Sequence, residues 1–323
     1  MTTVIDTTSS SPFRDGIQYA FDATTLGIAE TCLRKYKFTI IDRWRPKYKS
    51  VHLLFGGHFA TALEHYYKHV ALGMESNEAL IEVVWEALKN TWEYKLDEKG
   101  EKVFNDKGAP IGAPWMPADA NKTRESLIRS IVWYVDQFES DAIKVVTLAN
   151  GKPAVEYSFK LPVDNDIVLC GHIDRLVDYA GDYYCMDQKT TGTTITEKFF
   201  EQFKPNMQMS LYGFAGKAIY DLPVKGVIID GAQIAVGFTR FQRGFTFRSA
   251  ADLDEWYDDT MALIGTIQHA ARENIFPGNS ASCGNYGGCE FRKVCQQSPD
   301  VRGNFLRGDY QQEPQWNPLQ PRD

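Results

Sequence analysis

The sequence contains no hydrophobic run approaching the ~20 residues that a membrane-spanning helix needs. Its first residues, MTTVIDTTSSSPFRDG, are polar and lack the apolar centre of a secretion signal. We therefore expect a cytoplasmic protein that does not enter a membrane. In that reducing compartment, the six cysteines indicate free thiols or metal ligands rather than disulfides.

Two nucleotide-binding motifs are also missing. The pattern G-x-x-x-x-G-K-[ST] does not occur, which excludes helicase activity for this chain itself. The pattern G-x-G-x-x-G does not occur either, which argues against a redox enzyme that uses a nicotinamide or flavin. With 43% hydrophobic and 24% charged residues, the chain can nevertheless bury a substantial core.

The charge of the chain is unevenly distributed. A net charge of −7 argues at first against a nucleic-acid partner. Between positions 34 and 49, however, basic and aromatic residues alternate against a single acid. They are Arg34, Lys35, Lys37, Arg43, Arg45, Lys47 and Lys49, with Tyr36, Phe38, Trp44 and Tyr48 between them and Asp42 as the acid. Cations for phosphates and flat rings for bases would suit a single nucleic-acid strand. The alternative is a solvated basic surface above a few core aromatics.

The periodicity of hydrophobic residues changes along the chain. Helical patterns cover 24–41, 56–73, 77–96, 121–145, 196–220 and 250–274, and strand patterns cover 153–163, 166–179, 182–190, 224–236 and 243–249. We expect an α/β fold in which a small mixed sheet is flanked by helices. The expected parts are a flexible leader (1–20), one domain (21–298) and an extended tail (299–323). Within the domain we distinguish a helical part (21–150), a core (151–275) and a cysteine cluster (276–298).

The two strand segments 166–179 and 182–190 contain the most informative side chains. If the chain turns symmetrically between them, Asp174 stands opposite Asp187. Because side chains alternate along a strand, Asp187 and Lys189 project from the same face. This register predicts two carboxylates and an amine at one place on the sheet.

Directly opposed carboxylates repel each other at a separation of ~5 Å, unless a proton or cation lies between them. A divalent ion such as Mg²⁺ would relieve the repulsion of Asp174 and Asp187 and leave room for a phosphate and a water. Lys189 could hold or deprotonate that water and offset charge on the phosphate. The alternative is a surface hairpin with scattered charges. Glu156 is a further candidate for the outer acidic shell, or else a solvent-facing strand residue.

Four cysteines are candidates for a second site. Cys283, Cys289 and Cys295 form a C-x5-C-x5-C pattern, and Cys32 lies some 250 residues earlier. Four soft thiolates could bind zinc or an iron–sulfur cluster. Structural zinc sites usually use paired C-x2–4-C knuckles, which are missing here. Cys170 and Cys185 lie within apolar strand segments and are expected in the core.

The hairpin resembles a known family signature. GHID at 171–174 and DQKT at 187–190 are similar to the G-x-x-D…[DE]-x-K-T motif of PD-(D/E)XK nucleases, especially their RecB-like and CRISPR-associated exonuclease branch. The resemblance implies a restriction-endonuclease-like core, Mg²⁺ or Mn²⁺ on Asp174 and Asp187, and a catalytic role for Lys189. QMSLY at 208–212 matches the family's Q-x-x-x-Y motif, which implies that Gln208 and Tyr212 position the nucleic-acid strand.

One motif of the family is altered. The first helix of these enzymes reads G-x-x-x-H-x-x-L-E, and residues 56–64 match it except that Ala60 replaces the metal-binding histidine. Glu64 lies one helical turn beyond Ala60 and is the candidate for the third metal ligand. His58 and His65 are expected to be surface or structural residues.

The same resemblance bears on the cysteines. Iron–sulfur members of the family carry one cysteine before the nuclease core and three after it. This arrangement implies a [4Fe–4S] cluster on Cys32, Cys283, Cys289 and Cys295 that joins the two ends of the domain.

The order of motifs over about residues 25–297 predicts a metal-dependent DNA exonuclease, or a flap-trimming endonuclease. Such an enzyme would act in recombination, repair or phage-type DNA processing, where a separate helicase or recombination protein would be a fitting partner. The alternative is a DNA-binding or assembly module that retains the scaffold but cleaves weakly or not at all, which Ala60 favours.

Overall fold

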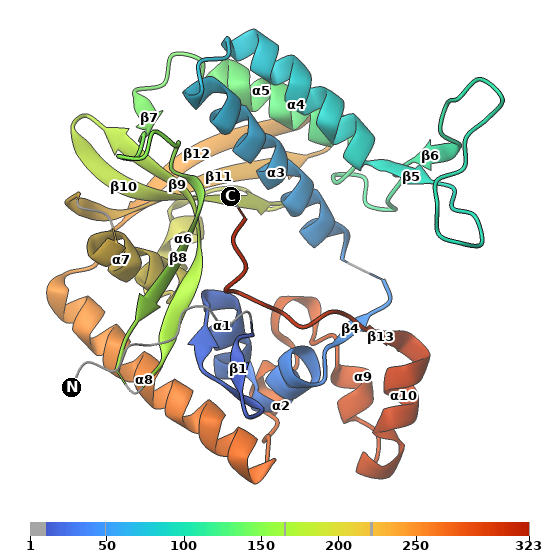
Figure 1. Cartoon of the computed structure of the whole chain (residues 1–323), viewed down its shortest axis with the longest axis vertical. Helices are drawn as coiled ribbons and strands as arrows, with labels where there is room; N and C mark the ends of the chain where they lie inside the picture. The colour runs from blue at the N-terminus through green and yellow to red at the C-terminus, as the bar shows by residue number, and fades with distance from the viewer. Residues whose placement is uncertain (1–10, 49, 165, 220–221, 323) are drawn as a thin grey trace.

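The computed structural model describes residues 11–48, 50–164, 166–219 and 222–322. A seven-stranded mixed sheet lies at the centre (Figure 1), with strand order β12-β11-β10-β9-β3 and with β7 and β8 also paired to β9. β10 runs parallel to β11, and β9 pairs antiparallel with β10. The strands are β3 (Ala20–Phe21), β7 (Ile143–Val145), β8 (Val155–Pro162), β9 (Val168–Tyr179), β10 (Asp182–Thr191), β11 (Val224–Ala235) and β12 (Phe238–Thr246). The predicted α/β fold with a flanked mixed sheet is confirmed.

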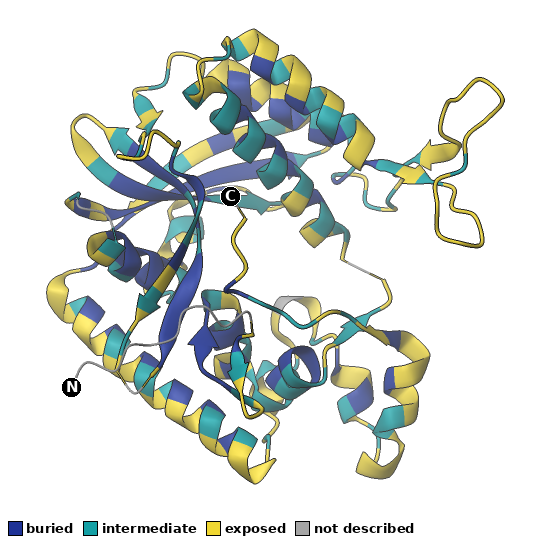
Figure 2. Cartoon of the chain, viewed as in Figure 1, coloured by how far each residue is buried: buried dark blue, intermediate teal, exposed yellow. Residues whose placement is uncertain are grey.

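Helices cover both faces of the sheet (Figure 1). On one side lie α3 (Val51–Ala71), α4 (Ser76–Asn90) and α5 (Arg124–Gln137), whose apolar side chains form a core with Ala232, Ile234 and Phe241 of the sheet. On the other lie α1 (Ala23–Thr31), α7 (Met207–Ile219) and α8 (Ala250–Glu273), which pack with Leu169, Ile173 and Ile229. Figure 2 shows the buried strands between these two layers. None of the helices in the described ranges has the length and hydrophobicity to span a membrane.

The predicted register of the central hairpin is confirmed along its paired part. Asp182 pairs with Tyr179, and the ladder continues in step to Met186 opposite Arg175. Beyond that pair, β9 leaves β10 and continues along β8, which it joins from Val155 onward. Asp174 therefore lies where β9 passes from one neighbour to the other.

Several predicted helix boundaries were wrong. The helix expected over 24–41 is interrupted at Cys32, whose extended backbone separates α1 from α2 (Leu33–Tyr36) and the π-helix Lys37–Ile41. α3 begins at Val51, so Gly56 and Gly57 lie inside the helix instead of opening it. The helix expected over 196–220 is divided into α6 (Glu197–Glu201) and α7, with a cis bond before Pro205 between them.

The two ends of the chain are more ordered than expected. Residues 1–10 of the predicted leader lie outside the described part, but β1 (Phe13–Arg14) and β2 (Ile17–Gln18) form a small hairpin and β3 joins the sheet. The tail is not extended throughout, because it contains α10 (Arg302–Asp309) and β13 (Tyr310–Gln312). β13 pairs with β4 (Trp44–Pro46), which places the tail against the N-terminal part. The remaining elements are β5 (Trp92–Tyr94) and β6 (Gly112–Pro114), which form a projecting arm, and α9 (Arg292–Cys295).

A buried ionic network fastens the sheet to α5. The fully buried Asp230 of β11 accepts hydrogen bonds from Arg175 Nη2 at 2.8 Å, from Arg243 Nε at 3.2 Å and from the Tyr134 hydroxyl. Arg175 also donates to Gln188 Oε1 at 3.2 Å, and Gln188 Nε2 donates to the Asp230 carbonyl at 2.7 Å. The network thus fixes Arg175 and Gln188, which follow Asp174 and Asp187 directly in the sequence.

Removing the central acid should destabilise the protein strongly. We expect Asp230→Asn to lower the free energy of unfolding by about 3–5 kcal/mol, because it leaves the buried guanidinium of Arg175 without a countercharge, whereas Arg243 keeps its pair with Asp141. Urea denaturation followed by circular dichroism measures the loss. The matched control is Asp182→Asn, which removes an exposed pair with Lys225 at 3.8 Å and should cost no more than about 1 kcal/mol. Equal losses in the two variants would contradict this account.

Candidate active site and cysteine-lined cavity

Asp187 carries a carboxylate into the interior of the sheet, where it is only 1% exposed. Its Oδ1 atom accepts a hydrogen bond from Gln208 at 3.1 Å. Its Oδ2 atom is buried without a hydrogen bond within the described chain, although Lys189 Nζ lies 2.5 Å away as an ion pair. Burial raises the pKa of Asp187 to about 7, with Lys189 acting against the rise and Asp174 adding to it. The Oδ2 atom is therefore enclosed, with the Lys189 ammonium as its neighbouring cation.

Asp174 lies between Asp187 and a second acid. Its Oδ2 accepts the backbone N–H of Gln188 at 2.9 Å, which ties it to β10. On the other side, β8 pairs with β9 at Val155 and again at Tyr157, so that Glu156 stands across from Asp174. Three strands thus bring three acids to one place.

Glu156 is the candidate that the sequence left most open, and it belongs to this acidic group. Burial raises its pKa to about 7, with the charges of Asp174 and Glu64 contributing to the rise and Arg322 acting against it. Its backbone has a φ of 51°, a conformation uncommon for residues other than glycine. The alternative of a solvent-facing strand residue does not hold, since Glu156 is 9% exposed.

Basic side chains pair with three of these four acids, Asp187, Glu64 and Glu156. Lys189 pairs with Asp187, Lys68 pairs with Glu64 at 2.9 Å, and Arg322 approaches Glu156 to 3.5 Å. Over the described ranges, no three His, Cys, Asp or Glu side chains are gathered closely enough to hold a metal ion as they stand. Glu64 from α3 reaches the acidic group electrostatically but contacts Lys68 directly.

Gln208 and Tyr212 of α7 form a chain of hydrogen bonds that begins at Lys189. Lys189 Nζ donates to Gln208 Oε1 at 3.0 Å, and Gln208 Nε2 donates to Asp187 and, at 3.0 Å, to the Tyr212 hydroxyl oxygen. The Tyr212 hydroxyl in turn donates to the His172 carbonyl at 2.6 Å. These two side chains therefore orient the lysine and one acid, and they tie α7 to β9.

The histidines near the altered motif lie in other contacts. His58 packs edge-on against Trp115 with ring centroids 5.8 Å apart, and burial lowers its pKa. His65 Nδ1 pairs with Glu86. Both contacts agree with the expectation of structural or surface residues, and Ala60 brings no ligand to the site.

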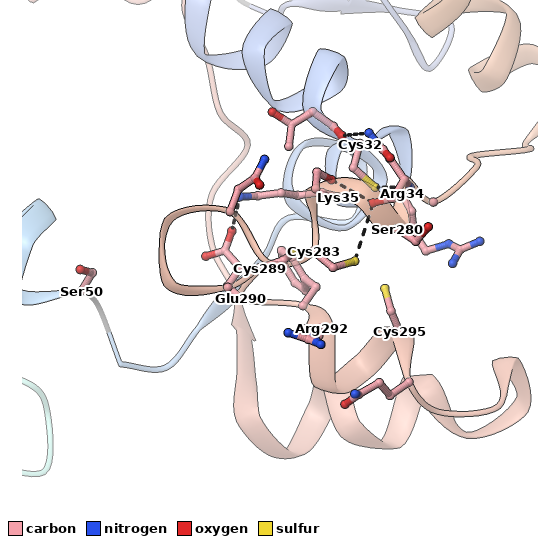
Figure 3. A pocket seen from close by; sticks show the side chains of 18 residues that line it. Cys32, Arg34, Lys35, Ser50, Ser280, Cys283, Cys289, Glu290, Arg292 and Cys295 are labelled. Atoms are coloured by element: carbon pink, nitrogen blue, oxygen red, sulfur yellow. Dashed lines mark hydrogen bonds and ion pairs between the residues drawn. The ribbon is translucent and has the colours of Figure 1, made fainter. Parts of the chain in front are cut away.

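The four predicted cysteines line one cavity of about 790 Å³ (Figure 3). Cys32 comes from the break between α1 and α2, Cys295 from the end of α9, and Cys283 and Cys289 from the loops between α8 and α9. The Asn279 amide donates to Cys32 Sγ at 3.3 Å. Segments about 250 residues apart in the sequence thus meet around a shared space.

Cations surround this cavity. Arg34, Lys35 and Arg292 line it, and the only acid among the described residues of its lining is Glu290, which pairs with Lys35 at 3.3 Å. Burial raises the pKa of Cys295, while Arg34 lowers it. The remaining cysteines, Cys170 and Cys185, are fully buried in the cores, as predicted.

Part of the basic stretch that begins at position 34 is held by contacts within the chain. Lys47 Nζ donates to the Gly308 carbonyl of the tail, and Arg45 donates to the Thr39 carbonyl. The rings of Tyr36 and Phe38 lie in the cores. These burials agree with the alternative of a basic surface above a few core aromatics, since Arg43 and Lys47 are exposed while Tyr36 and Phe38 are buried. Lys49 lies outside the described residues.

Known proteins provide an independent comparison. Curated protein sequences include no significant match. Among solved structures, a protein from Eubacterium rectale that is provisionally named an exonuclease is similar with a TM-score of 0.48 and 12% identity, over 82% of this chain and 86% of that one. The family model of the PD-(D/E)XK nuclease superfamily matches residues 21–296. Because this match spans most of the sequence, the chain belongs to the PD-(D/E)XK nuclease superfamily.

Proposed function

We propose that the protein is a metal-dependent DNA nuclease, acting as an exonuclease or on flaps in recombination, repair or phage-type DNA processing. The observation that carries the proposal is the meeting of Asp174, Asp187 and Lys189 at adjacent strand positions, with Gln208 bound to both Lys189 and Asp187. Two acids and a lysine suit the hydrolysis of a phosphodiester bond.

The side chains fit a divalent cation. The buried Oδ2 of Asp187 has no hydrogen bond within the described chain, and the repulsion among Asp174, Glu156 and Glu64 favours a positive charge between them. Asp174 and Asp187 would hold Mg²⁺ or Mn²⁺, with Glu64 as the third ligand. When bound, such an ion supplies Lewis-acid activation of the phosphate and of water.

Lys189 would work on the attacking water. Its ammonium is fixed between Asp187 and Gln208, so it can hold a water and offset the negative charge that grows on the phosphate. Tyr212 acts through Gln208, because its hydroxyl accepts from the Gln208 amide and so selects which end of the amide faces Lys189. Gln208 and Tyr212 are therefore positioning residues.

The lysine provides the most direct test. We expect Lys189→Met to lower the rate of DNA cleavage in Mn²⁺ at least ~100-fold, since it removes a group that stabilises the transition state. Degradation of end-labelled DNA on denaturing gels measures the rate. Lys198→Met, at an exposed position of α6, is the matched control and should cleave like the wild type. Equal cleavage by Lys189→Met and the wild type would remove the assigned mechanism.

The acidic group also predicts how stability depends on pH. Without metal, in EDTA, the pKa values of Glu156 and Asp187 in the folded protein are about 7. Between about pH 4.5 and 7 the folded protein therefore keeps protons on these two acids, whereas the unfolded chain has already released them. Stability should therefore fall as pH rises from about 4.5 to 7, by up to about 3 kcal/mol for Glu156 alone.

Thermal unfolding across this pH range measures the decline. Glu156→Gln should show a shallower decline, while Glu93→Gln, an exposed control on β5, should follow the wild type. Adding Mg²⁺ or Mn²⁺ at pH 7 should restore stability, because the ion binds the ionised acids. A flat wild-type profile, or no effect of metal, would contradict the proposed site.

A second candidate is a DNA-binding module without cleavage. Ala60 in place of the family's histidine favours it, as does the pairing of Glu64 with Lys68. This candidate predicts that DNA binding persists in EDTA and that no divalent metal supports cleavage, so the same cleavage assay separates it from the first.

For the cysteine-lined cavity we propose a [4Fe–4S] cluster on Cys32, Cys283, Cys289 and Cys295. The supporting observations are the convergence of four thiols on one cavity and the three cations beside them, which would balance an anionic thiolate cluster. The role would be structural: cross-linking segments about 250 residues apart is worth on the order of 4–5 kcal/mol by loop-entropy estimates.

Iron analysis tests the cluster. Protein purified without oxygen should be brown and contain iron and acid-labile sulfide, and Cys289→Ser should lose both and unfold at a lower temperature. Cys185→Ala, which alters a thiol in the core, is the control and should keep the iron. Stoichiometric zinc without iron in the wild type would replace this proposal by a zinc site.

A further inference from the structure

A second cavity, of about 450 Å³, lies beside the acidic group. It is lined by Lys189 and Thr190 of β10, by Gly56 and Gly57 of α3, and by Lys122 from the loop before α5. The described residues of its lining include a third basic residue, His52, and no carboxylate. A space lined by cations, hydroxyls and bare backbone next to a catalytic lysine has the character of an anion site.

Lys122 is the unusual member of this lining. The residue is only 2% exposed, and its Nζ has no hydrogen-bond partner within the described chain. The nearest contact is the ring of Phe55, 4.7 Å from Nζ to the ring centroid. A buried ammonium without an anionic partner is costly unless something else compensates it. Burial lowers the pKa of Lys122 to about 8, because the charged form is disfavoured in this enclosed position.

The neighbouring acid does not serve as this partner. Asp119 accepts the backbone N–H groups of Asn121 and Lys122 at 2.7 and 3.2 Å, and it pairs with His52 at 3.7 Å. Its carboxylate thus orders the loop that carries Lys122 and raises the pKa of the lysine by its charge, but it accepts no hydrogen bond from Nζ. Lys122 therefore lines the cavity as a residue whose ammonium is enclosed by the protein.

The backbone of α3 leaves room on the opposite wall. A Cβ at Gly56 would lie 3.1 Å from Thr190 Oγ1, so this glycine permits α3 to approach the end of β10 closely. A Cβ at Gly57 would meet no described atom within 4 Å, so the helix surface there is open. A tetrahedral anion can therefore approach between α3, β10 and the Lys122 loop.

We propose that this cavity binds a phosphate group of the substrate strand next to the one that is cleaved, with Lys122 as its principal charge. The inference rests on the proposed nuclease function for the identity of the ligand. Lys122 would fix the register of the strand relative to Asp174, Asp187 and Lys189, so it is a binding residue and takes no part in the chemical step.

The test compares DNA binding by Lys122→Met and Lys122→Arg. Methionine keeps the aliphatic chain over Phe55 but removes the charge, and arginine keeps the charge. Binding of a fluorescent single-stranded oligonucleotide is measured by anisotropy in Ca²⁺ at 50–200 mM salt (about the range over which phosphate contacts are resolved), with the DNA checked to be intact afterwards. Thermal unfolding verifies that each variant is folded.

We expect Lys122→Met to bind about tenfold more weakly or worse, as for the loss of a charge-assisted hydrogen bond. The slope of log K against log salt should become shallower by about 0.7, because one phosphate contact is lost. A merely structural lysine would not change this slope. Lys122→Arg should stay near the wild type, and Lys198→Met, an exposed lysine, is the matched control.

Oligonucleotides with and without a terminal phosphate identify the source of the ligand. A loss confined to phosphorylated ends assigns the cavity to a terminal phosphate, and an equal loss on both assigns it to an internal phosphodiester. Wild-type affinity and salt slope in a folded Lys122→Met protein would overturn the inference. Because binding is measured without cleavage, a wild type that binds DNA through Lys122 but never cuts it would refute only the nuclease proposal.

Discussion

The structure depends on the burial of negative charge at the point where β9 passes from β10 to β8. Asp187 is enclosed in the sheet, Asp174 lies beside it, and Glu156 faces Asp174 from the third strand. Such a group is unfavourable in a low-dielectric interior, and the fold compensates it with cations drawn from several elements. Lys189 comes from the same strand as Asp187, and Arg322 comes from the end of the tail. The ion pair of Arg322 with Glu156 adds to the other contacts of the tail in this region, such as the packing of Leu319 against Val168 and Cys170.

Hydrogen bonds and ion pairs connect this acidic group to the helices on both faces of the sheet. On the α7 side, Gln208 connects Lys189 to Asp187 and to Tyr212. On the α5 side, Arg175 and Asp230 form a fully buried pair that also binds Gln188. Residues 174 and 175 therefore point to opposite layers, as neighbours on a strand must, and each is anchored there. The candidate active site is rigid because both helical layers hold it.

The cysteine-lined cavity lies where the segment after α1 meets the segment after α8. The segments that follow α1 and α8 consist of short helices, short strands and loops. Their contacts are a small aromatic cluster that includes Phe38, Phe291 and Tyr310, and the pairing of β13 with β4. Thiols gathered from both segments would complete this junction when they share a ligand, which explains why the chain brings Cys32 and Cys295 to one cavity.

Much of this arrangement was determined by local sequence. The strand patterns and the symmetric turn predicted the register of the β9–β10 hairpin, because a one-residue slip would have turned Asp187 and Lys189 to the other face. The i, i+4 spacing of Gln208 and Tyr212 likewise predicted that both would act together from one face of α7. The family motifs gave the superfamily, and the four cysteines were predicted to converge.

Only the tertiary structure decided the rest, because it depends on contacts between segments that no local pattern relates. Sequence spacing could not reveal that Glu156 faces Asp174, since the pairing of β8 with β9 is set by packing. Nor could it show that β13 of the tail pairs with β4 in the basic stretch after Cys32. It also could not show that the buried Lys122 lines the same cavity as Lys189, with no acid among the described residues of that lining. Periodicity determines which residues share a face, whereas the partner of each charge is fixed only when distant segments pack together.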